Sequence, residues 1–313
     1  MSKNQQILVT NHFHPETIDL LDKKFSTHHL WKLADKDKLD LISSLQGKCQ
    51  AVATASWVCD EAIYKLTSLQ LISCFGVGVD AIDFNKTKEM QVRVTNTPDV
   101  LNDSVADIAI ALILACTRNL VSADKFVRSK KWQAGPLPFG QSIRNKTLGI
   151  AGFGRIGEEI AKRAETFGLK IAYHNRNPKD VPFTYHGSIT ELAAASDILL
   201  CMLPGGKDTK NAINAPVLKE LGPTGTFINV GRGSSVDEDA LVLALQQRQI
   251  QAAGLDVYAD EPNVPEALLA MDNVVLLPHI GSATVETRRA MGQLVIDNIE
   301  AFFADKPLLT EVV

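Results

Sequence analysis

The chain has 313 residues, of which 45% are hydrophobic and 22% are charged. These proportions are ordinary for a globular protein with a large core, and the length suits two domains of about 150 residues each. The formal net charge of -4 and the pI near 6.0 argue against a protein that holds nucleic acid through phosphate contacts.

The apolar segments and the cysteines are those of a protein without a membrane anchor. The N-terminus runs straight into Ile7-Leu8-Val9 and lacks the cleavage site of a secretory signal. The longest apolar stretch, residues 108–116, is too short to span a bilayer and is expected to be a buried helix. The five cysteines are scattered and form no C-x-x-C pair. This pattern favours reduced core thiols in a cytoplasmic protein.

Short apolar runs alternate with amphipathic stretches in the first third of the chain. The alternation predicts strands over residues 7–10, 51–54, 71–74 and 92–95. It also predicts helices over residues 15–24, 60–69 and 83–90. Strands that alternate with helices in this way are typical of βαβ units on a parallel sheet.

Pro98 ends this first series, because proline disfavours helix at the residue before it. A long helix over residues 104–129 and a proline- and glycine-containing loop over residues 132–140 follow. A second alternating series spans residues 147–278, and a last helix is expected over residues 284–303. The predicted fold class is α/β, with two Rossmann- or flavodoxin-like, doubly wound parallel-sheet domains joined by long helices. The closing helix is expected to pack back on the first half.

A glycine-rich turn follows the first strand of the second series. Residues 148–157 read as a strand that runs into G-x-G-x-x-G, and helix-compatible residues follow, which is the context that a dinucleotide-binding fingerprint requires. Gly152 would allow the tight turn, Gly154 the approach of the pyrophosphate and Gly157 close packing of helix on strand. The predicted cofactor-binding residues of this turn are Gly152, Phe153, Gly154, Arg155, Ile156 and Gly157.

The end of the next strand carries no carboxylate that could grip a ribose 2′-hydroxyl. Residues 170–173 form that predicted strand, and no acid occurs before Asp180. Asn175 and Arg176 stand in the place instead, and a guanidinium suits a 2′-phosphate. These two residues predict NADP (NADPH) as the cofactor, with NAD as the less favoured choice. The alternative is that Arg176 is only a solvated loop cation.

Polar side chains follow three apolar runs of the second series. Arg232, Asp256 with Glu261, and His279 each come directly after such a run, where ligands sit in open α/β sheets. Arg232 can bind a carboxylate and polarise the neighbouring carbonyl. His279 can give a proton to the carbonyl oxygen as hydride reaches the carbon. Glu261, within reach of His279, would favour the imidazolium and orient its ring.

These motifs, in this order, resemble the D-isomer-specific 2-hydroxyacid dehydrogenases. The resemblance covers essentially the whole chain and is greatest to the glyoxylate/hydroxypyruvate and hydroxyphenylpyruvate reductase branch. It is carried by GVGVDAID (residues 76–83), TPDVLNDSVAD (97–107), GFGRIG (152–157), NVGRG (229–233), GLDVYADEP (254–262) and LLPHIGSATVETR (276–288). It implies a substrate-binding domain of residues 1–98 plus 285–313 and an NAD(P)-binding Rossmann domain of residues 99–284.

The resemblance also implies roles for single residues. The family's catalytic Arg, Glu and His fall on Arg232, Glu261 and His279. The turn at Val77-Gly78 matches the segment that holds the substrate carboxylate, together with Arg232 and His279. Asp256 matches the residue near the nicotinamide carboxamide. Further predicted cofactor contacts are Pro204, Thr209, Val230, Gly231, Arg232, His279 and Gly281, although Gly205-Gly206 departs from the commoner residues of its loop.

The resemblance implies a homodimer that acts on small-molecule substrates and needs no metal. The apolar helix around residues 106–114 suits a dimer interface but equally suits the core of its own domain. The specificity pocket is expected near Trp57, Phe75, Val77, Leu101 and the loop over residues 132–140.

The predicted activity is NADPH-dependent reduction of glyoxylate and hydroxypyruvate to D-2-hydroxy acids, with His279 as acid and base. Hydroxyphenylpyruvate and 2-ketogluconate are alternative types of substrate. A non-enzymatic NAD(P)-sensing protein is a further alternative, which the Arg232, Glu261 and His279 set argues against. Phosphoglycerate and formate dehydrogenases are less favoured, because this chain ends at Val313 and carries Glu261 where the formate enzymes have Gln.

Overall fold

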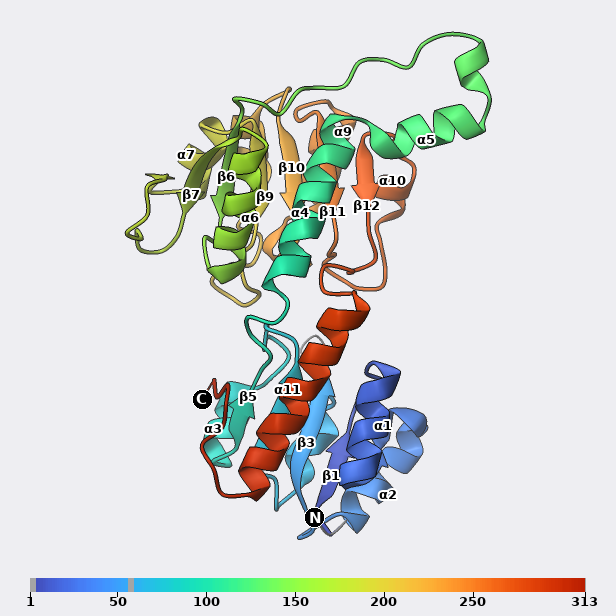
Figure 1. Ribbon diagram of the computed structural model, residues 1–313, viewed down its shortest axis with the longest axis vertical. Helices are drawn as coiled ribbons and strands as arrows, with labels where there is room; N and C mark the ends of the chain where they lie inside the picture. Colours follow the sequence, from blue (N-terminus) through green and yellow to red (C-terminus); the bar gives the residue numbers. More distant parts are fainter. Residues whose placement is uncertain (1–3, 56–58, 313) are drawn as a thin grey trace. The chain divides into compact units, whose positions relative to one another are not determined.

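The computed structural model describes residues 4–55 and 59–312, so the predicted pocket residue Trp57 lies outside it. The chain divides into two compact units, which are described separately (Figure 1). Unit 1 comprises Met1–Leu101 and Thr284–Val313, and unit 2 comprises Asn102–Ala283. Each unit has one parallel sheet with helices packed on it, so the predicted α/β fold of two doubly wound domains is confirmed.

The sheet of unit 1 has five parallel strands in the order β2-β1-β3-β4-β5, as in flavodoxin-like folds. Its strands are β1 (Gln6–Val9), β2 (Ser26–His29), β3 (Cys49–Ala55), β4 (Leu71–Phe75) and β5 (Arg93–Thr95). The apolar pattern predicted four of them. It missed β2, which lies at the edge of the sheet and consists of half-buried Ser, Thr and His residues without apolar alternation.

The helices of unit 1 are α1 (Pro15–Lys24), α2 (Asp35–Ser44), α3 (Phe84–Glu89) and α11 (Val285–Phe303), with the short 3-10 helices η1 (Leu30–Lys32) and η2 (Glu61–Lys65). The predicted helix over residues 60–69 was wrong, because only the 3-10 turn η2 forms there, capped by Asp60. Helix α2 was also missed. The closing helix α11 packs on β4 and α1, where a Cβ on Gly292 would lie 1.9 Å from Thr17 Oγ1.

The sheet of unit 2 has seven parallel strands in the order β12-β11-β10-β9-β6-β7-β8, the order of Rossmann folds with one added edge strand. These are β6 (Thr147–Ala151), β7 (Lys170–His174), β8 (Thr184–Tyr185), β9 (Ile198–Cys201), β10 (Thr226–Asn229), β11 (Ala252–Leu255) and β12 (Val274–Leu276). Its topological switch point lies between β6 and β9. The carboxyl ends of the central strands therefore open on one shared crevice.

Helices cover both faces of this sheet. The helices of unit 2 are α4 (Asn102–Thr117), α5 (Leu120–Arg128), α6 (Arg155–Thr166), α7 (Ile189–Ala194), α8 (Ala215–Leu221), α9 (Glu238–Gln246) and α10 (Glu266–Leu269), with the 3-10 helices η3 (Lys131–Gln133) and η4 (Gly233–Ser235). Successive residues of a strand point to opposite faces of the sheet. Leu199 and Phe227 pack with α7, α8 and α9, whereas Gly254 faces Leu112 and Cys116 of α4.

The predicted single helix over residues 104–129 was wrong. Helix α4 ends at Thr117, and Asn119 takes the left-handed conformation with φ 53° before α5 begins, so the two helices are bent by 60°. Asparagine tolerates this conformation better than most residues, but nothing in the pattern of apolar residues marks it. Of the helices described, none alone is long and apolar enough to cross a membrane, and only the bent α4–α5 pair passes that test jointly.

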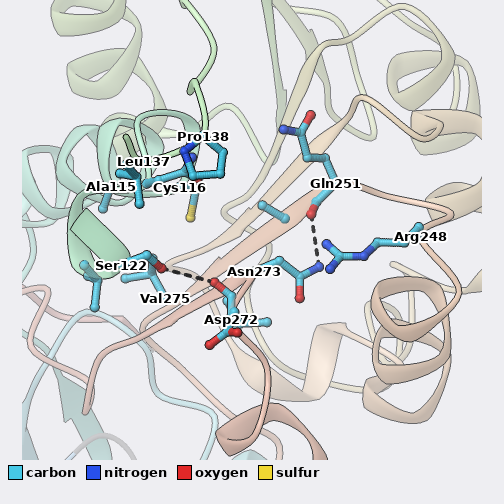
Figure 2. Close-up of a pocket in the computed structure, with 14 residues that line it drawn as sticks. Ala115, Cys116, Ser122, Leu137, Pro138, Arg248, Gln251, Asp272, Asn273 and Val275 are labelled. Atoms are coloured by element: carbon cyan, nitrogen blue, oxygen red, sulfur yellow. Dashed lines mark hydrogen bonds between the residues drawn. The ribbon is translucent and has the colours of Figure 1, made fainter. Parts of the chain in front are cut away.

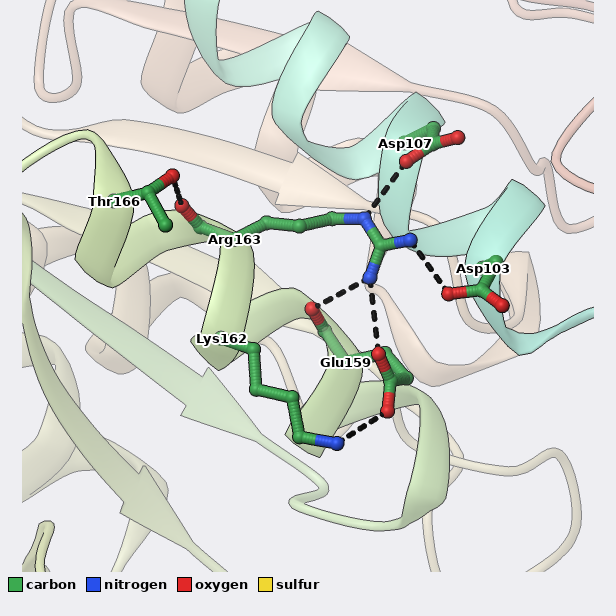
Figure 3. A network of polar contacts seen from close by, with 6 residues as sticks. All are labelled: Asp103, Asp107, Glu159, Lys162, Arg163 and Thr166. Carbon is green, nitrogen blue, oxygen red and sulfur yellow. Dashed lines mark hydrogen bonds and ion pairs between the residues drawn. The ribbon is translucent and has the colours of Figure 1, made fainter.

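Helix α4 packs along α6 on one face of the unit 2 sheet (Figure 1). Arg163 of α6 joins the two helices, because its guanidinium donates to Asp103 and Asp107 of α4 and to Glu159 of its own helix (Figure 3). Most apolar side chains of α4 are buried against α6, β10 and β11. The apolar character of this helix is therefore explained by the core of its own unit.

Candidate active site

The turn after β6 has the geometry that a dinucleotide needs. Gly152 has φ 95°, and a Cβ there would lie 2.7 Å from Met202 O at the end of β9. A Cβ on Gly157 would lie 3.2 Å from Gly152 O, so this glycine lets α6 approach the strand. A Cβ on Gly154 would meet nothing within 4 Å. Two of the glycines are thus required by packing, and the third faces open space.

The N-terminus of α6 is available to an anion. Gly154 is the N-cap residue, and no side chain caps the helix there. The positive end of the helix dipole therefore lies next to the open space at Gly154. This arrangement fits the pyrophosphate of a dinucleotide.

The segment after β7, where the adenosine ribose is expected, is tied down by side chains. Asn175 accepts from Phe153 N–H at 2.7 Å and donates to Phe153 O at 3.0 Å. The hydroxyl of Tyr173 accepts from the N–H of Lys179 and donates to its carbonyl. Both the oxygen and the nitrogen of the Asn175 amide therefore bind the glycine-rich turn. The sequence predicted Asn175 only as a cofactor contact and not in this positioning role.

Two cations lie beside this segment. Arg176 is exposed directly after Asn175. The Nζ of Lys179 lies 2.6 Å from Glu158 of α6 and over the ring of Phe153. Lys179 was not predicted from the sequence. Its position near the turn depends on the hydrogen bonds between the Tyr173 hydroxyl and the backbone of Lys179.

The predicted acid–base pair forms at the carboxyl ends of β11 and β12. His279 Nδ1 lies 2.6 Å from Glu261 Oε2, and the other carboxylate oxygen accepts from Tyr258 N–H at 3.1 Å. Burial by itself would raise the pKa of Glu261, but the hydrogen bond and charge of His279 outweigh it, so the pKa of this carboxyl lies below its usual value. The charge of Arg232 adds to this lowering of the pKa.

The loop that carries Arg232 is fixed from both sides. The carbonyl of Arg232 accepts from the buried Asn229 side chain at 3.1 Å and from the Ser235 hydroxyl at 2.6 Å. A Cβ on Gly233 would lie 1.8 Å from the carbonyl carbon of Tyr258, so the Arg232 loop and the loop that leads to Glu261 are in direct backbone contact. The structure thus brings Arg232, Glu261 and His279 together within unit 2.

Asp256 holds the backbone around the catalytic histidine. Its carboxylate accepts from Ile280 N–H at 2.7 Å and Gly281 N–H at 2.8 Å, and its carbonyl accepts from His279 N–H at 2.8 Å. The carboxyl is 1% exposed, and burial raises its pKa. His279 has φ 53°, an uncommon conformation for a residue other than glycine, so these hydrogen bonds secure a strained backbone. The predicted contact of Asp256 with the carboxamide stays a prediction.

The other predicted cofactor residues lie on the loops after β9 and β10. Thr209 donates to Pro204 O at 2.6 Å and so closes the loop between them. Val230 is buried, and a Cβ on Gly231 would lie 2.9 Å from Leu203 O. These loops share the carboxyl edge of the sheet with the glycine-rich turn.

Val77 and Gly78 belong to unit 1, in the turn after β4. Asn96 holds this turn by donating to Val77 O at 2.8 Å. Of the predicted pocket residues nearby, Phe75 and Leu101 are buried. The turn belongs to unit 1 and the acid–base pair to unit 2, so the role of Val77-Gly78 in substrate binding stays a prediction.

A cavity of about 330 Å³ lies elsewhere in unit 2 (Figure 2). It is bordered by Ala252 and Val274, which begin β11 and β12, and by Arg248, Pro138 and Cys116. Its walls thus include the amino ends of strands whose carboxyl ends carry the acid–base pair. This cavity is therefore separate from the candidate active site.

Comparison with known proteins assigns the chain to a family. The family model described as "D-isomer specific 2-hydroxyacid dehydrogenase, NAD binding domain" matches residues 110–281. The chain belongs to this family. The predicted resemblance is therefore confirmed, and the protein is an oxidoreductase whose unit 2 holds the matched nucleotide-binding domain.

Similar proteins come from plants and bacteria. The chain is 47% identical over 299 residues to a hydroxyphenylpyruvate reductase of Plectranthus scutellarioides, with 94% of each protein covered. It is 45% identical over 299 residues to a glyoxylate/hydroxypyruvate reductase of Arabidopsis thaliana, again with 94% of each covered. A solved NADPH-dependent glyoxylate/hydroxypyruvate reductase of Sinorhizobium meliloti, in complex with NADP and malonate, superposes with a TM-score of 0.91 at 41% identity. That comparison covers 99% of this chain and 97% of the other.

Proposed function

We propose that this protein catalyses the NADPH-dependent reduction of small 2-oxo acids, glyoxylate and hydroxypyruvate, to D-2-hydroxy acids. The observation that carries the proposal is the 2.6 Å pair of His279 and Glu261 beside Arg232, on the sheet edge that also bears the glycine-rich turn. A protein that only senses the nucleotide has no need of a paired proton donor next to an anion-binding guanidinium.

The chain's own residues divide the work of the reduction. Arg232 binds the substrate carboxylate and polarises the adjacent carbonyl. Glu261 holds Nδ1 of His279, and the other ring nitrogen, Nε2, gives its proton to the carbonyl oxygen. When bound, the reduced nicotinamide supplies the hydride that the carbonyl carbon takes up. The 2-oxo acid thus gains one hydride and one proton and leaves as the 2-hydroxy acid.

The direct test is the oxidation of NADPH with each candidate substrate. We expect turnover with glyoxylate and hydroxypyruvate, and slower turnover with hydroxyphenylpyruvate and 2-ketogluconate. The identity to the Plectranthus hydroxyphenylpyruvate reductase makes that aryl substrate the second candidate. Lack of turnover with all four substrates would favour the non-enzymatic, nucleotide-sensing alternative.

The preference for NADPH is proposed to depend on Arg176. Replacing the exposed guanidinium in Arg176→Ala should raise KM for NADPH about tenfold and leave KM for NADH nearly unchanged, because a charge-assisted hydrogen bond contributes roughly 1.5–3 kcal/mol. Steady-state kinetics with both nucleotides measures this, with the exposed Lys170→Ala as the matched control. Equal losses with both nucleotides would mean that Arg176 does not read the 2′-phosphate.

We also propose that the protein is a homodimer joined through α5 and the segment that follows it. Helix α5 has no buried residue, and Val127, Trp132 and Phe139 are exposed, with Phe139 fully so. In Figure 1 this segment extends away from the sheet of unit 2. Exposed apolar side chains gathered on one segment are typical of a protein interface.

The dimer proposal is tested by the mass in solution. We expect a particle of twice 34.1 kDa in sedimentation, and a shift to the single-chain mass in the double variant Trp132→Glu/Phe139→Glu. Phe167→Glu, an exposed aromatic on the same unit but outside the segment, is the control. A wild-type chain that sediments at 34.1 kDa would contradict the proposal.

A cytoplasmic location is proposed from the thiols. All five cysteines are free, and burial raises the pKa of Cys49 to about 11 and that of Cys116 to about 12. Free, unreactive core thiols suit a reducing compartment. Cell fractionation against a cytoplasmic marker tests this, and recovery in a secreted fraction would contradict it.

A further inference from the structure

Glu238 is a charged residue for which neither the sequence nor the proposed mechanism has a role. It is the first residue of α9, directly after the N-cap residue Asp237. Its side chain is half-buried, and burial, together with repulsion from Asp239, Asp260 and Glu261, raises its pKa. A carboxylate is thus kept next to three others, where its charge is unfavourable.

The contact made by this carboxylate leads to the catalytic pair. Glu238 Oε1 accepts from Ala259 N–H at 2.9 Å. Ala259 follows Tyr258, whose N–H donates to Glu261, and so lies inside the turn that sets the position of the catalytic carboxylate. This hydrogen bond crosses from the segment after β10 to the segment after β11. Arg232 also lies in the segment after β10. The hydrogen bond therefore links the segment that contains Arg232 to the turn that contains Glu261.

A steric contact acts on the same turn. Gly233 lies against the backbone of Tyr258 and Ala259, where a Cβ would be 1.8 Å from one carbonyl carbon and 2.3 Å from the next nitrogen. This contact is steric and fixes how near the turn can come. The hydrogen bond to Glu238 is directional and fixes its rotation, since a backbone N–H prefers a nearly linear acceptor.

We propose that Glu238 is a positioning residue that holds the 258–261 turn and thereby keeps the Glu261 carboxylate in hydrogen-bond distance of His279. The inference rests on the proposed function for its kinetic consequence. Its structural part, the hold on Ala259, is independent of any activity. The helix N-terminus of α9 stabilises the carboxylate in this place, because the positive end of the helix dipole favours an anion in the first turn.

Three variants test the proposal by turnover. Glu238→Ala should lower kcat about tenfold while KM for the 2-oxo acid and the Kd for NADPH, measured by nucleotide fluorescence, stay within twofold. Glu238→Gln should recover most of kcat, because its amide oxygen can accept from the same N–H. Asp239→Ala, the exposed neighbour in the same helical turn, is the matched control and should match the wild type. Unchanged kcat in Glu238→Ala, or equal losses in Ala and Gln, would overturn the proposal.

Hydrogen exchange on the nucleotide-free chain separates this inference from the proposed function. The amide of Ala259 should exchange at least tenfold faster in Glu238→Ala than in the wild type, and near the wild-type rate in Glu238→Gln. If the wild type reduces no 2-oxo acid but exchange follows this pattern, the proposed function fails and the hold on the turn stands. If turnover is present and exchange at Ala259 is the same in all variants, the positioning role is refuted.

Discussion

The variant His279→Ala is expected to lose reductive turnover by roughly 100- to 10,000-fold while it binds NADPH as tightly as the wild type. A positioned acid or base contributes about that much to a proton-transfer step. In the wild type, Glu261 holds the imidazole at Nδ1 over 2.6 Å, and the Asp256 carbonyl holds the backbone N–H of His279 over 2.8 Å. In the variant, Glu261 and Asp256 are unchanged, but no imidazole remains to give the proton.

Steady-state kinetics and NADPH fluorescence titration together check this prediction. The matched control is His186→Ala, which should keep wild-type kcat. His186 follows β8, the edge strand opposite β12 in the sheet. Retention of most of kcat in His279→Ala would show that another group gives the proton. A large loss of NADPH affinity would instead assign His279 to nucleotide binding.

The parts of the site that could be predicted are those with a local cause. Gly152 is needed for a turn with φ 95° and Gly157 for the close packing of α6 on that turn, and both lie in the motif over residues 152–157. The meeting of Arg232, Glu261 and His279 was predictable for a different reason. Each follows a strand of one parallel sheet, and the carboxyl ends of such strands share an edge.

The parts that could not be predicted depend on contacts between distant segments. The bond between Asn175 and Phe153 spans 22 residues, and that between Glu238 and Ala259 spans 21. No periodicity marks either pair. Asn175 was assigned to the cofactor by its place after β7, and that place does not show what its amide contacts.

The errors in the predicted fold have a similar physical origin. The edge strand β2 was missed because an edge needs no apolar alternation, and the break at Asn119 was missed because apolar spacing continues across it. The apolar residues of α4 were open to two interpretations, an interface or a core. The packing against α6 and the sheet accounts for most of them as core, and the exposed Trp132 and Phe139 add α5 and the segment after it as a proposed interface.

The variant Glu261→Gln is expected to lose activity in a pH-dependent way. In the wild type the hydrogen bond from His279 outweighs burial and keeps the pKa of Glu261 below its usual value, so the carboxylate is ionised from mildly acidic pH upward. The ionised carboxylate accepts the hydrogen bond from Nδ1 and so holds the ring with Nε2 toward the substrate. The amide of glutamine carries no negative charge, which is also the state that the wild-type carboxyl reaches when acid protonates it.

The direction of the pH dependence follows from the charge of Glu261. Wild-type turnover should fall in acid as the Glu261 carboxyl is protonated below its usual pKa, and Glu261→Gln should lack this acid limb. The ratio of wild-type to variant kcat should thus be roughly 100-fold at neutral pH and shrink in acid, below the usual pKa of a glutamate. Profiles of kcat against pH, with Glu266→Gln on α10 as the matched control, measure this. A ratio that stays constant with pH would mean that Glu261 only orients the ring, and a ratio near one at every pH would remove it from the mechanism.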